Sequence, residues 1–302
     1  MKIPFVYHAS YSQLALPSQH RFPTSKYQNL FDYAIEQNLV CPSMHHQANK
    51  IDISLIKQVH NADYVDAFIN GSIHPKALRR IGFPWSESLV KRTLHAVNGT
   101  LLTCQLALNH QISVHFTGGY HHAHYDFGSG FCIFNDLVIA ASHLIETQQV
   151  DKVLIFDCDV HQGDGTATLC QGNPNIISCS IHCKQNFPSR KPISDYDIEL
   201  DKGCSDEEYL SYIGSVFGYL IQLHQPDLII YDAGVDIHQD DDLGYLNIST
   251  QGILARDELV LTLAKHHNIP VAAVIGGGYS RQADKLTQRH SQLLIAANHV
   301  WV

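Results

Sequence analysis

The sequence VLIFDCDVHQGDG, at residues 153–165, decides the fold class. Its first four residues are apolar and form a short run that suits a buried β-strand. Aspartates, a histidine and glycines follow at once. Ligands of open parallel sheets bind beyond the carboxyl ends of the strands, where these residues would lie. The stretch therefore predicts a buried parallel strand with chemically active side chains at its end.

Short apolar runs of this kind alternate with longer segments whose apolar residues recur every three or four positions. We predict strands at 3–7, 112–116, 152–156, 175–179, 227–231 and 270–275. We predict helices at 87–109, 135–147, 206–224 and 250–267. This alternation indicates one α/β domain over residues 1–302, with a mostly parallel central sheet and helices on both faces. The first 85 or so residues are less regular, and we expect loops, the first strand and short helices there.

The composition excludes several classes of protein. The chain has 302 residues, 45% of them apolar and 16% charged, so it is too apolar for an intrinsically disordered protein. Its net charge of −9 argues against direct nucleic-acid binding. It has no run of about 18 apolar residues, so we expect no membrane-spanning helix. Histidine is unusually frequent, at 21 residues against 20 lysines and arginines, which suggests metal binding or proton transfer.

The cysteines and the N-terminal segment predict a cytoplasmic protein. The chain has eight cysteines, several of them inside apolar runs, and no C-x-x-C pair. Pro4 and His8 interrupt any apolar segment that could serve as a secretory signal. We therefore expect reduced, packed thiols, including Cys158 between its two aspartates.

Four polar segments directly follow four of the predicted strands. They are TGGYHHA at 117–123, DCDVHQGDG at 157–165, DAGVD at 232–236 and GGGY at 276–279. Because the carboxyl ends of parallel strands meet at one edge of a sheet, we expect these segments to converge.

Three residues of these segments predict a metal site. Asp159 and His161 are two positions apart, so in an extended chain both side chains point to the same side. Asp236 follows another strand and is the natural third ligand. One histidine and two carboxylates suit a first-row divalent ion. Zinc, with a fourth position left for water, is the default, and Fe²⁺ or Co²⁺ would also fit.

The remaining polar residues predict acid–base chemistry beside the metal. His121 and His122 can exchange protons near neutral pH. Asp157 and Asp164 could each accept the far ring N–H of one of these histidines, which fixes its tautomer. The phenol of Tyr279, behind three glycines, could donate a hydrogen bond to a developing oxyanion.

These segments, in this order, resemble those of the histone deacetylase family, and the resemblance covers nearly the whole chain. It rests on the four segments above and on Gly130-Phe131-Cys132. Further segments resemble the compact class IV branch and its bacterial relatives: 20–23 with 26–27, 80–85, 186–188 and 242–246. The resemblance implies a zinc amidohydrolase of the arginase/deacetylase fold that removes acyl groups from a lysine-type amine.

The resemblance also implies a role for each matching residue. It assigns zinc to Asp159, His161 and Asp236, acid–base catalysis to His121 and His122 backed by Asp157 and Asp164, and oxyanion binding to Tyr279. A narrow tunnel for the acyl-lysine stem would be formed by Gly130, Phe131 and Phe187, with Leu243 at its rim. A structural K⁺ or Na⁺ would be held by Asp157, Asp159, His161, Ser180 and Ile181. One departure is Gln162, where many members have a second histidine, and we expect little effect from it.

The implied reaction is hydrolysis of the amide by metal-activated water. One histidine, His122 for preference, takes a proton from the water. A protonated histidine delivers a proton to the leaving amine. The sequence alone leaves open which histidine does which step. It also leaves open the length of the acyl group and the oligomeric state.

Several alternatives to a protein lysine deacylase remain. The substrate could instead be an acetylated polyamine or another small-molecule amide. A non-catalytic acyl-lysine or metal-binding module is a further alternative, against which the intact Tyr279, His121 and His122 argue. A dinuclear arginase-like hydrolase would need Asp-x-His-x-Asp, and here Gly163 stands two places after His161.

The segment HQDDD at 238–242 is the most acidic part of this region. A solvated loop is the ordinary interpretation of such a run. The alternative hypothesis is that it attracts a cationic substrate to the mouth of the pocket.

Overall fold

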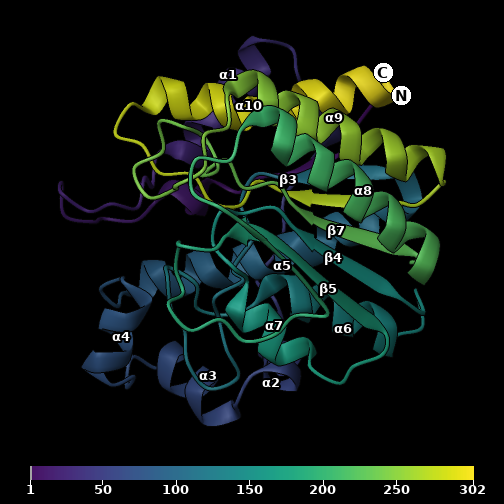
Figure 1. Ribbon diagram of the computed structural model, residues 1–302. Coiled ribbons are helices and arrows are strands. Elements are labelled where there is room, and N and C mark those ends of the chain that lie inside the picture. The colour runs from purple at the N-terminus through teal and green to yellow at the C-terminus, as the bar shows by residue number, and fades with distance from the viewer. Residues whose placement is uncertain (1) are drawn as a thin grey trace.

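The computed structural model describes residues 2–302, and a β-sheet of eight strands runs through its centre (Figure 1). The strand order is β2-β1-β3-β8-β7-β4-β5-β6, and all neighbouring strands are parallel. The strands are β1 (Phe5–Val6), β2 (His45–His46), β3 (Ile112–His115), β4 (Val153–Asp157), β5 (Ile176–Cys183), β6 (Tyr196–Leu200), β7 (Leu228–Asp232) and β8 (Val271–Val274). The predicted α/β class with a parallel sheet is confirmed.

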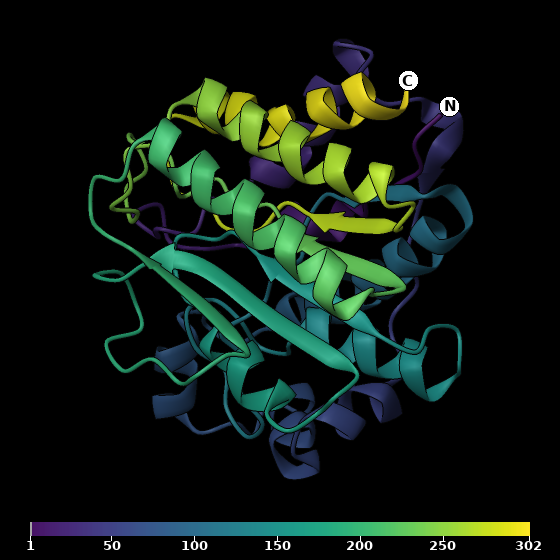
Figure 2. The same cartoon turned by 45° about the vertical axis from the view of Figure 1, so that its right-hand side comes forward.

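Helices cover both faces of this sheet, as Figures 1 and 2 show. The green to yellow helices α8, α9 and α10 lie over one face, and the blue and teal helices α5, α6 and α7 lie over the other. The α-helices are α1 (Lys26–Glu36), α2 (Ile53–Val59), α3 (Ala62–Ile69), α4 (Pro75–Ile81), α5 (Glu87–His110), α6 (Asp136–Glu146), α7 (Asp164–Cys170), α8 (Asp206–His224), α9 (Thr250–His266) and α10 (Ala283–Trp301). Two short 3₁₀ helices lie at Ala9–Ser12 and Pro42–Met44.

The central strands are apolar throughout because both of their faces are buried. Along β4, Leu154 and Phe156 belong to one core cluster, and Val153 and Ile155 belong to the other. Alternation of side chains along a strand sends successive residues to opposite faces of the sheet. This is why the central strands of the sequence are continuous apolar runs and not alternating ones.

Some elements differ from the prediction. The first strand, predicted at 3–7, is only Phe5–Val6, and the strand predicted at 175–179 extends to Cys183. Helix α10 and strand β6 were not predicted. β6 pairs only with β5 and is partly exposed, so its sequence YDIEL lacks the apolar run that marks the central strands. α10 mixes polar and apolar residues and has no side-chain cap at its start.

The four strands whose ends carry the polar segments are immediate neighbours in the order β3-β8-β7-β4. Asp157, the last residue of β4, lies in register with Asp232, the last residue of β7. Asp232 is in turn paired with Val274 at the end of β8. The predicted convergence of the segments at one sheet edge is therefore confirmed.

Two further expectations concern the chain as a whole. All eight cysteines are free, and all except Cys41 are buried. Cys158 is fully buried, and burial raises the pKa of its thiol, so it is a packed residue and not a nucleophile. No helix within residues 2–302 is sufficiently long and apolar to cross a membrane.

Candidate active site

The three predicted metal ligands lie together beyond the ends of β4 and β7. Nδ1 of His161 is 2.9 Å from Oδ1 of Asp159 and 3.2 Å from Oδ2 of Asp236. All three residues are buried, and one donor atom from each lies within 4.8 Å of the others. The i, i+2 spacing of Asp159 and His161 therefore brings both side chains to one point, as expected.

Backbone amides fix the two carboxylates of this cluster. The N–H groups of His161 and Gly277 donate to the carboxylate of Asp159 at 2.9 and 3.0 Å. The N–H of Val160 donates to Oδ1 of Asp236 at 2.9 Å. Hydrogen bonds of this kind favour the charged form of a carboxylate and orient its remaining oxygen.

The residues fit a divalent metal ion. The donor set of one imidazole nitrogen and two carboxylates suits a first-row metal. Gly277 leaves room on one side, since a Cβ there would lie 2.2 Å from an oxygen of Asp159 and of Asp236. Burial works against a charge on His161, but its hydrogen bonds with the two carboxylates raise its pKa to about 10. The cluster thus favours a positive charge at the place where a cation would sit.

The paired histidines are each backed by the aspartate that the sequence indicated. Nδ1 of His121 lies 2.7 Å from Oδ2 of Asp157, and Nδ1 of His122 lies 2.6 Å from Oδ1 of Asp164. All four side chains are buried. Asp164 also lies 3.2 Å from Nε2 of His124, a contact that the sequence did not suggest.

The two histidines differ in the charge that their surroundings favour. Burial acts to lower the pKa of His121, but the carboxylates of Asp157 and Asp159 outweigh it and hold that pKa well above its usual range. Burial and the nearby charge of His121 lower the pKa of His122 to about 4. The surroundings therefore favour the protonated form of His121 and the neutral form of His122. Two titratable groups whose pKa values are shifted in opposite directions are suited to the acid and the base steps of one reaction.

Tyr279 stands across the site from these histidines. Its ring centre is 6.4 Å from that of His161, and its backbone N–H donates to Oδ2 of Asp241 at 2.8 Å. Burial and the charge of Asp159 raise the pKa of its phenol well above the usual value. The phenol is therefore a neutral hydrogen-bond donor over the whole working pH range.

The predicted tunnel residues line one cavity of about 880 Å³ with the acid–base residues. Its lining includes Gly130, Phe131, Phe187, Leu243, His122, His161 and Tyr279. The ring of Phe187 meets that of His122 edge-on, with centres 4.8 Å apart, and Phe131 lies 5.9 Å from Tyr279. Aromatic walls above buried polar groups are typical of a site for a ligand with an apolar stem.

The residues that the resemblance linked to a monovalent cation also lie beside this site. Ser180 on β5 is in register with Asp157 on β4. Its hydroxyl lies 3.4 Å from the backbone N of Gly163 and 3.0 Å from Nδ1 of His182. Ile181 is fully buried next to it. The cation itself stays a prediction.

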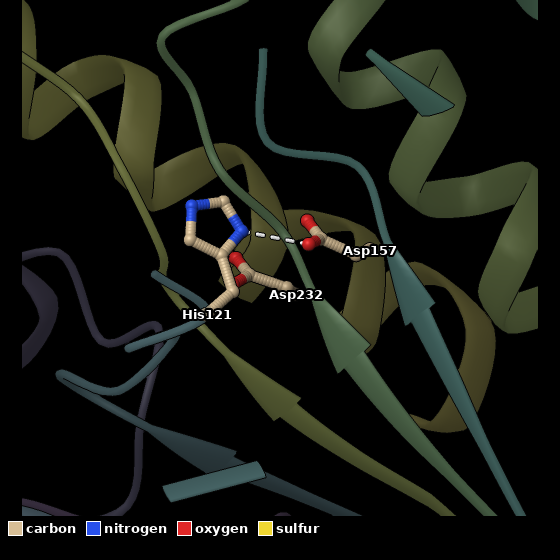
Figure 3. Close-up of side chains that lie close together, drawn as sticks. All are labelled: His121, Asp157 and Asp232. Carbon is tan, nitrogen blue, oxygen red and sulfur yellow. Dashed lines mark hydrogen bonds and ion pairs between the residues drawn. The ribbon is translucent and has the colours of Figure 1, made fainter. Parts of the chain in front are cut away.

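Asp232 belongs to the site and was given no role on the basis of the sequence. It ends β7 opposite Asp157, and its carboxyl points toward the ring of His121 (Figure 3). The three residues offer donor atoms within 4.8 Å of one another. Asp232 is fully buried, and neither of its oxygens has a hydrogen-bond partner. Its position inside the DAGVD segment was the only available signal.

Two glycines pack closely against the carboxyl group of Asp232. A Cβ at Gly119 would lie 2.3 Å from its Oδ2, and one at Gly276 would lie 1.9 Å from its Oδ1. Burial raises the pKa of Asp232 well above its usual value, and the charges of Asp157 and Asp159 raise it further. Asp232 is therefore protonated in the folded protein under conditions in which it would ionise in the unfolded chain.

Replacing Asp232 by Asn should change how stability depends on pH. Below the unfolded-state pKa near 3.8, the carboxyl is protonated in both states and does not change the free energy of unfolding with pH. As the pH rises from there toward the raised folded-state pKa, the unfolded chain releases this proton and the folded protein keeps it, so the protein becomes less stable. In metal-free protein, the free energy of unfolding of the wild type should fall relative to Asp232→Asn by up to about 1.4 kcal/mol per pH unit. Urea unfolding between about pH 4 and pH 8 measures this difference.

Asp126→Asn is the matched control because Asp126 is exposed. It should leave the pH dependence of unfolding close to that of the wild type. Parallel curves for the wild type and Asp232→Asn would show instead that Asp232 is ionised in the folded protein.

The acidic loop at 238–242 borders the active-site cavity, because the exposed Asp242 directly precedes Leu243 of the cavity lining. The hypothesis that the loop attracts a cationic substrate stays a prediction. Asp241 turns toward the protein and accepts the backbone N–H of Tyr279. Asp240 lies 3.6 Å from Arg289 on α10. None of the three acids of this loop lines the cavity. Hydrogen bonds to backbone N–H groups hold Asp241, and an ion pair holds Asp240, whereas Asp242 is exposed in an adjoining hollow that shares Leu243 and Tyr279 with the cavity.

Comparisons with known proteins agree with this geometry. The sequence profile described as histone deacetylase domain matches residues 20–294, which is most of the chain. The chain belongs to the histone deacetylase family. Members of this family are generally metal-dependent, and a hydrolytic deacetylase is the activity that membership suggests.

Individual relatives of this family member carry different names. An uncharacterized protein of Picosynechococcus sp. is 44% identical over the full length of both chains. Histone deacetylase 2 of Arabidopsis thaliana is 27% identical, covering 94% of this chain and 76% of its own. The acetoin utilization protein AcuC of Staphylococcus aureus is also 27% identical, with 92% and 77% covered. The crystal structure of the HDA15 HD domain superimposes with a TM-score of 0.80 over 98% of this chain and 92% of that one, at 17% identity, which shows the shared fold.

Proposed function

We propose that this histone deacetylase family member is a zinc-dependent amidohydrolase. It would remove acetyl or longer acyl groups from the ε-amine of lysine in proteins or peptides. The observation that carries the proposal is one cavity that reaches His161 of the metal cluster, the acid–base histidine His122 and the phenol of Tyr279. A binding module would need no proton acceptor, proton donor and oxyanion donor around the same space.

Asp159, His161 and Asp236 would hold the metal. When bound there, a divalent ion supplies Lewis acidity to the carbonyl oxygen of the amide and to the attacking water. His161 must lose its proton for this, and the two carboxylates offset the charge of the ion. The preference of these N and O donors for a first-row divalent metal supports zinc as the ion.

The histidines divide the proton transfers. His122 is neutral, so its ring can accept a proton from the attacking water, while Asp164 holds the ring in place through Nδ1 at 2.6 Å. The surroundings of His121, paired with Asp157, favour its protonated form, so it would supply positive charge and a proton to the leaving amine. Release of the amine with that proton and of the carboxylate completes the hydrolysis.

Tyr279 and the cavity walls position the substrate. The phenol of Tyr279 donates a hydrogen bond to the oxygen of the amide as negative charge develops on it. Phe131 and Phe187 flank the stem of the acyl-lysine, with Gly130 in the wall and Leu243 at the rim. A K⁺ or Na⁺ held by Asp157, Asp159, His161, Ser180 and Ile181 would stiffen the strand ends that carry the metal ligands.

The test compares substrates with the purified protein reconstituted with zinc. Acetyl-, butyryl- and myristoyl-lysine peptides should be hydrolysed, with the free acid measured by mass spectrometry, and a chelator should abolish the activity. Acetylated polyamines serve as the competing substrates. Turnover of polyamines alone would contradict the lysine assignment, and binding of acyl-lysine peptides without any turnover would contradict the enzyme assignment.

A further inference from the structure

The mouth of the active-site cavity is lined by cations from two separate segments. Arg80 lies in the last turn of α4, and Arg190 and Lys191 lie in the loop between β5 and β6. Among the described residues 2–302, Asp164 is the sole carboxylate of the cavity lining. Its oxygens contact the rings of His122 and His124. The part of the entrance that α4 and the β5–β6 loop form is therefore positively charged, in a chain whose net charge is −9.

These cations are not neutralised by carboxylates of the chain. Arg80 and Arg190 are both exposed, and within residues 2–302 neither has an acidic side chain within ion-pair distance. Lys191 donates to the backbone oxygens of Asn186 and Pro188, at 2.8 and 2.7 Å, which are neutral acceptors. The charge of the mouth is thus available to a ligand.

Two of the cations are also held in place. The guanidinium of Arg80 lies over the ring of Phe127, with its central carbon 3.5 Å from the ring centre. The two carbonyl contacts of Lys191 tie its ammonium to its own loop. A charge that is already positioned loses less side-chain entropy when a ligand pairs with it. These residues are therefore better suited to recognition than free surface cations would be.

Exposed aromatic side chains lie in the same entrance. Phe187 is 45% exposed and Tyr245 is 46% exposed, although both are large and apolar. Aromatic residues and arginines together are enriched at surfaces that bind polypeptides. The mouth thus offers contact area for a peptide backbone as well as charge for its side chains.

We infer that this mouth selects acyl-lysines in acidic sequences, with Arg80 and Arg190 contacting carboxylates near the modified residue. The inference rests on the proposed function. Consecutive Cα atoms are about 3.8 Å apart, so residues one or two positions from the acyl-lysine lie over the mouth while its stem fills the cavity. A carboxylate there pairs with an arginine, whereas a lysine or a polyamine is repelled.

The experiment uses three acetyl-lysine peptides of equal length that carry Glu, Gln or Lys at two positions on each side. An acetyl-lysine amide without flanking residues reports the basal reaction. At low salt, kcat/KM should be about 10-fold higher for the Glu peptide than for the Gln peptide, mainly through KM, and lowest for the Lys peptide. At about 0.5 M salt most of the difference should disappear.

Variants locate the effect. Arg80→Gln and Arg190→Gln should each reduce the preference for the Glu peptide over the Gln peptide by roughly 2- to 5-fold, and the double variant should nearly remove it. Arg79→Gln is the matched control, because Arg79 is exposed in the same helical turn and does not line the cavity. It should keep the full preference.

A binding measurement gives a second readout that is independent of turnover. Fluorescence anisotropy of labelled Glu and Gln peptides, with a chelator present, should show the same preference and the same loss in the double variant. If the unflanked amide is hydrolysed but the three peptides are equivalent, or the Lys peptide is best, the inference is overturned and the proposed function stands. If neither the amide nor any peptide is hydrolysed, both fail.

Discussion

Tyr279→Phe should lower kcat about 100- to 1,000-fold, the usual effect of removing one preorganised donor to an oxyanion. The substitution deletes only a hydroxyl that lines the cavity, and the ring keeps its contact with Phe131. The backbone of Tyr279 is held independently by Asp241, so the loop should keep its position. The measurement is steady-state kinetics on an acetyl-lysine peptide, and KM should change far less than kcat.

Tyr212→Phe supplies the control for this substitution. Tyr212 lies on α8, is 42% exposed and is not part of the cavity lining, so loss of its hydroxyl should leave the kinetics unchanged. An unchanged kcat in Tyr279→Phe would remove Tyr279 from the reaction. If Tyr279→Phe lost metal or folded protein to the same extent as activity, the role of Tyr279 would be to maintain the structure of the site.

The metal cluster and the histidine pairs could be predicted because they depend on simple backbone rules. Asp157, Asp159 and His161 follow one strand directly, and Asp236 follows a neighbouring one, so a parallel sheet alone brings them to a common edge. Backbone amides then complete the site without any further sequence pattern, as the bond from Gly277 to Asp159 shows. The resemblance to a family added the roles of residues in the cavity wall.

Asp232 shows what this approach misses. Its sequence environment is that of any polar residue at a strand end. Its lack of hydrogen-bond partners arises only when Gly119 and Gly276, from two other loops, pack against its carboxyl. Neither contact can be predicted without the three-dimensional arrangement of β3, β7 and β8.

The placement of charges around the cavity could not be predicted for a related reason. The sequence shows that 238–242 is acidic but not which way its side chains point. Asp241 turns inward because the amide of Tyr279 needs an acceptor. Arg80 and Arg190 come from segments far apart in the chain, and only the folded structure brings them to one entrance.

Asp236→Asn should abolish both tight metal binding and activity. The substitution removes one of the two negative charges of the cluster while keeping the size of the side chain. We expect a loss of activity of roughly 1,000-fold or more, because the chemistry depends on the metal. Metal content after dialysis, measured by mass spectrometry, should fall from about one equivalent of zinc per chain to near zero.

Thermal unfolding separates loss of metal from loss of fold. A ligand present at 1,000 times its Kd adds about 4 kcal/mol to the free energy of unfolding, so zinc should raise the Tm of the wild type and not that of Asp236→Asn. Asp240→Asn, in the adjacent acidic loop, should behave as the wild type because Asp240 pairs with Arg289 and lies outside the cluster. Two equivalents of metal in the wild type would contradict the single-ion site.

The pH dependence of metal binding provides the strictest check of this cluster. Hydrogen bonds to the carboxylates outweigh burial and raise the pKa of His161 to about 10, so below that pH a metal ion must displace the proton of its ring. Binding should then release about one proton, and the apparent affinity should rise about tenfold per pH unit between roughly pH 6.5 and pH 8.5. Calorimetry in buffers of different ionisation enthalpy measures the released proton. Binding that is independent of pH over this range would mean that His161 is already neutral and would remove it as the residue whose proton the metal replaces.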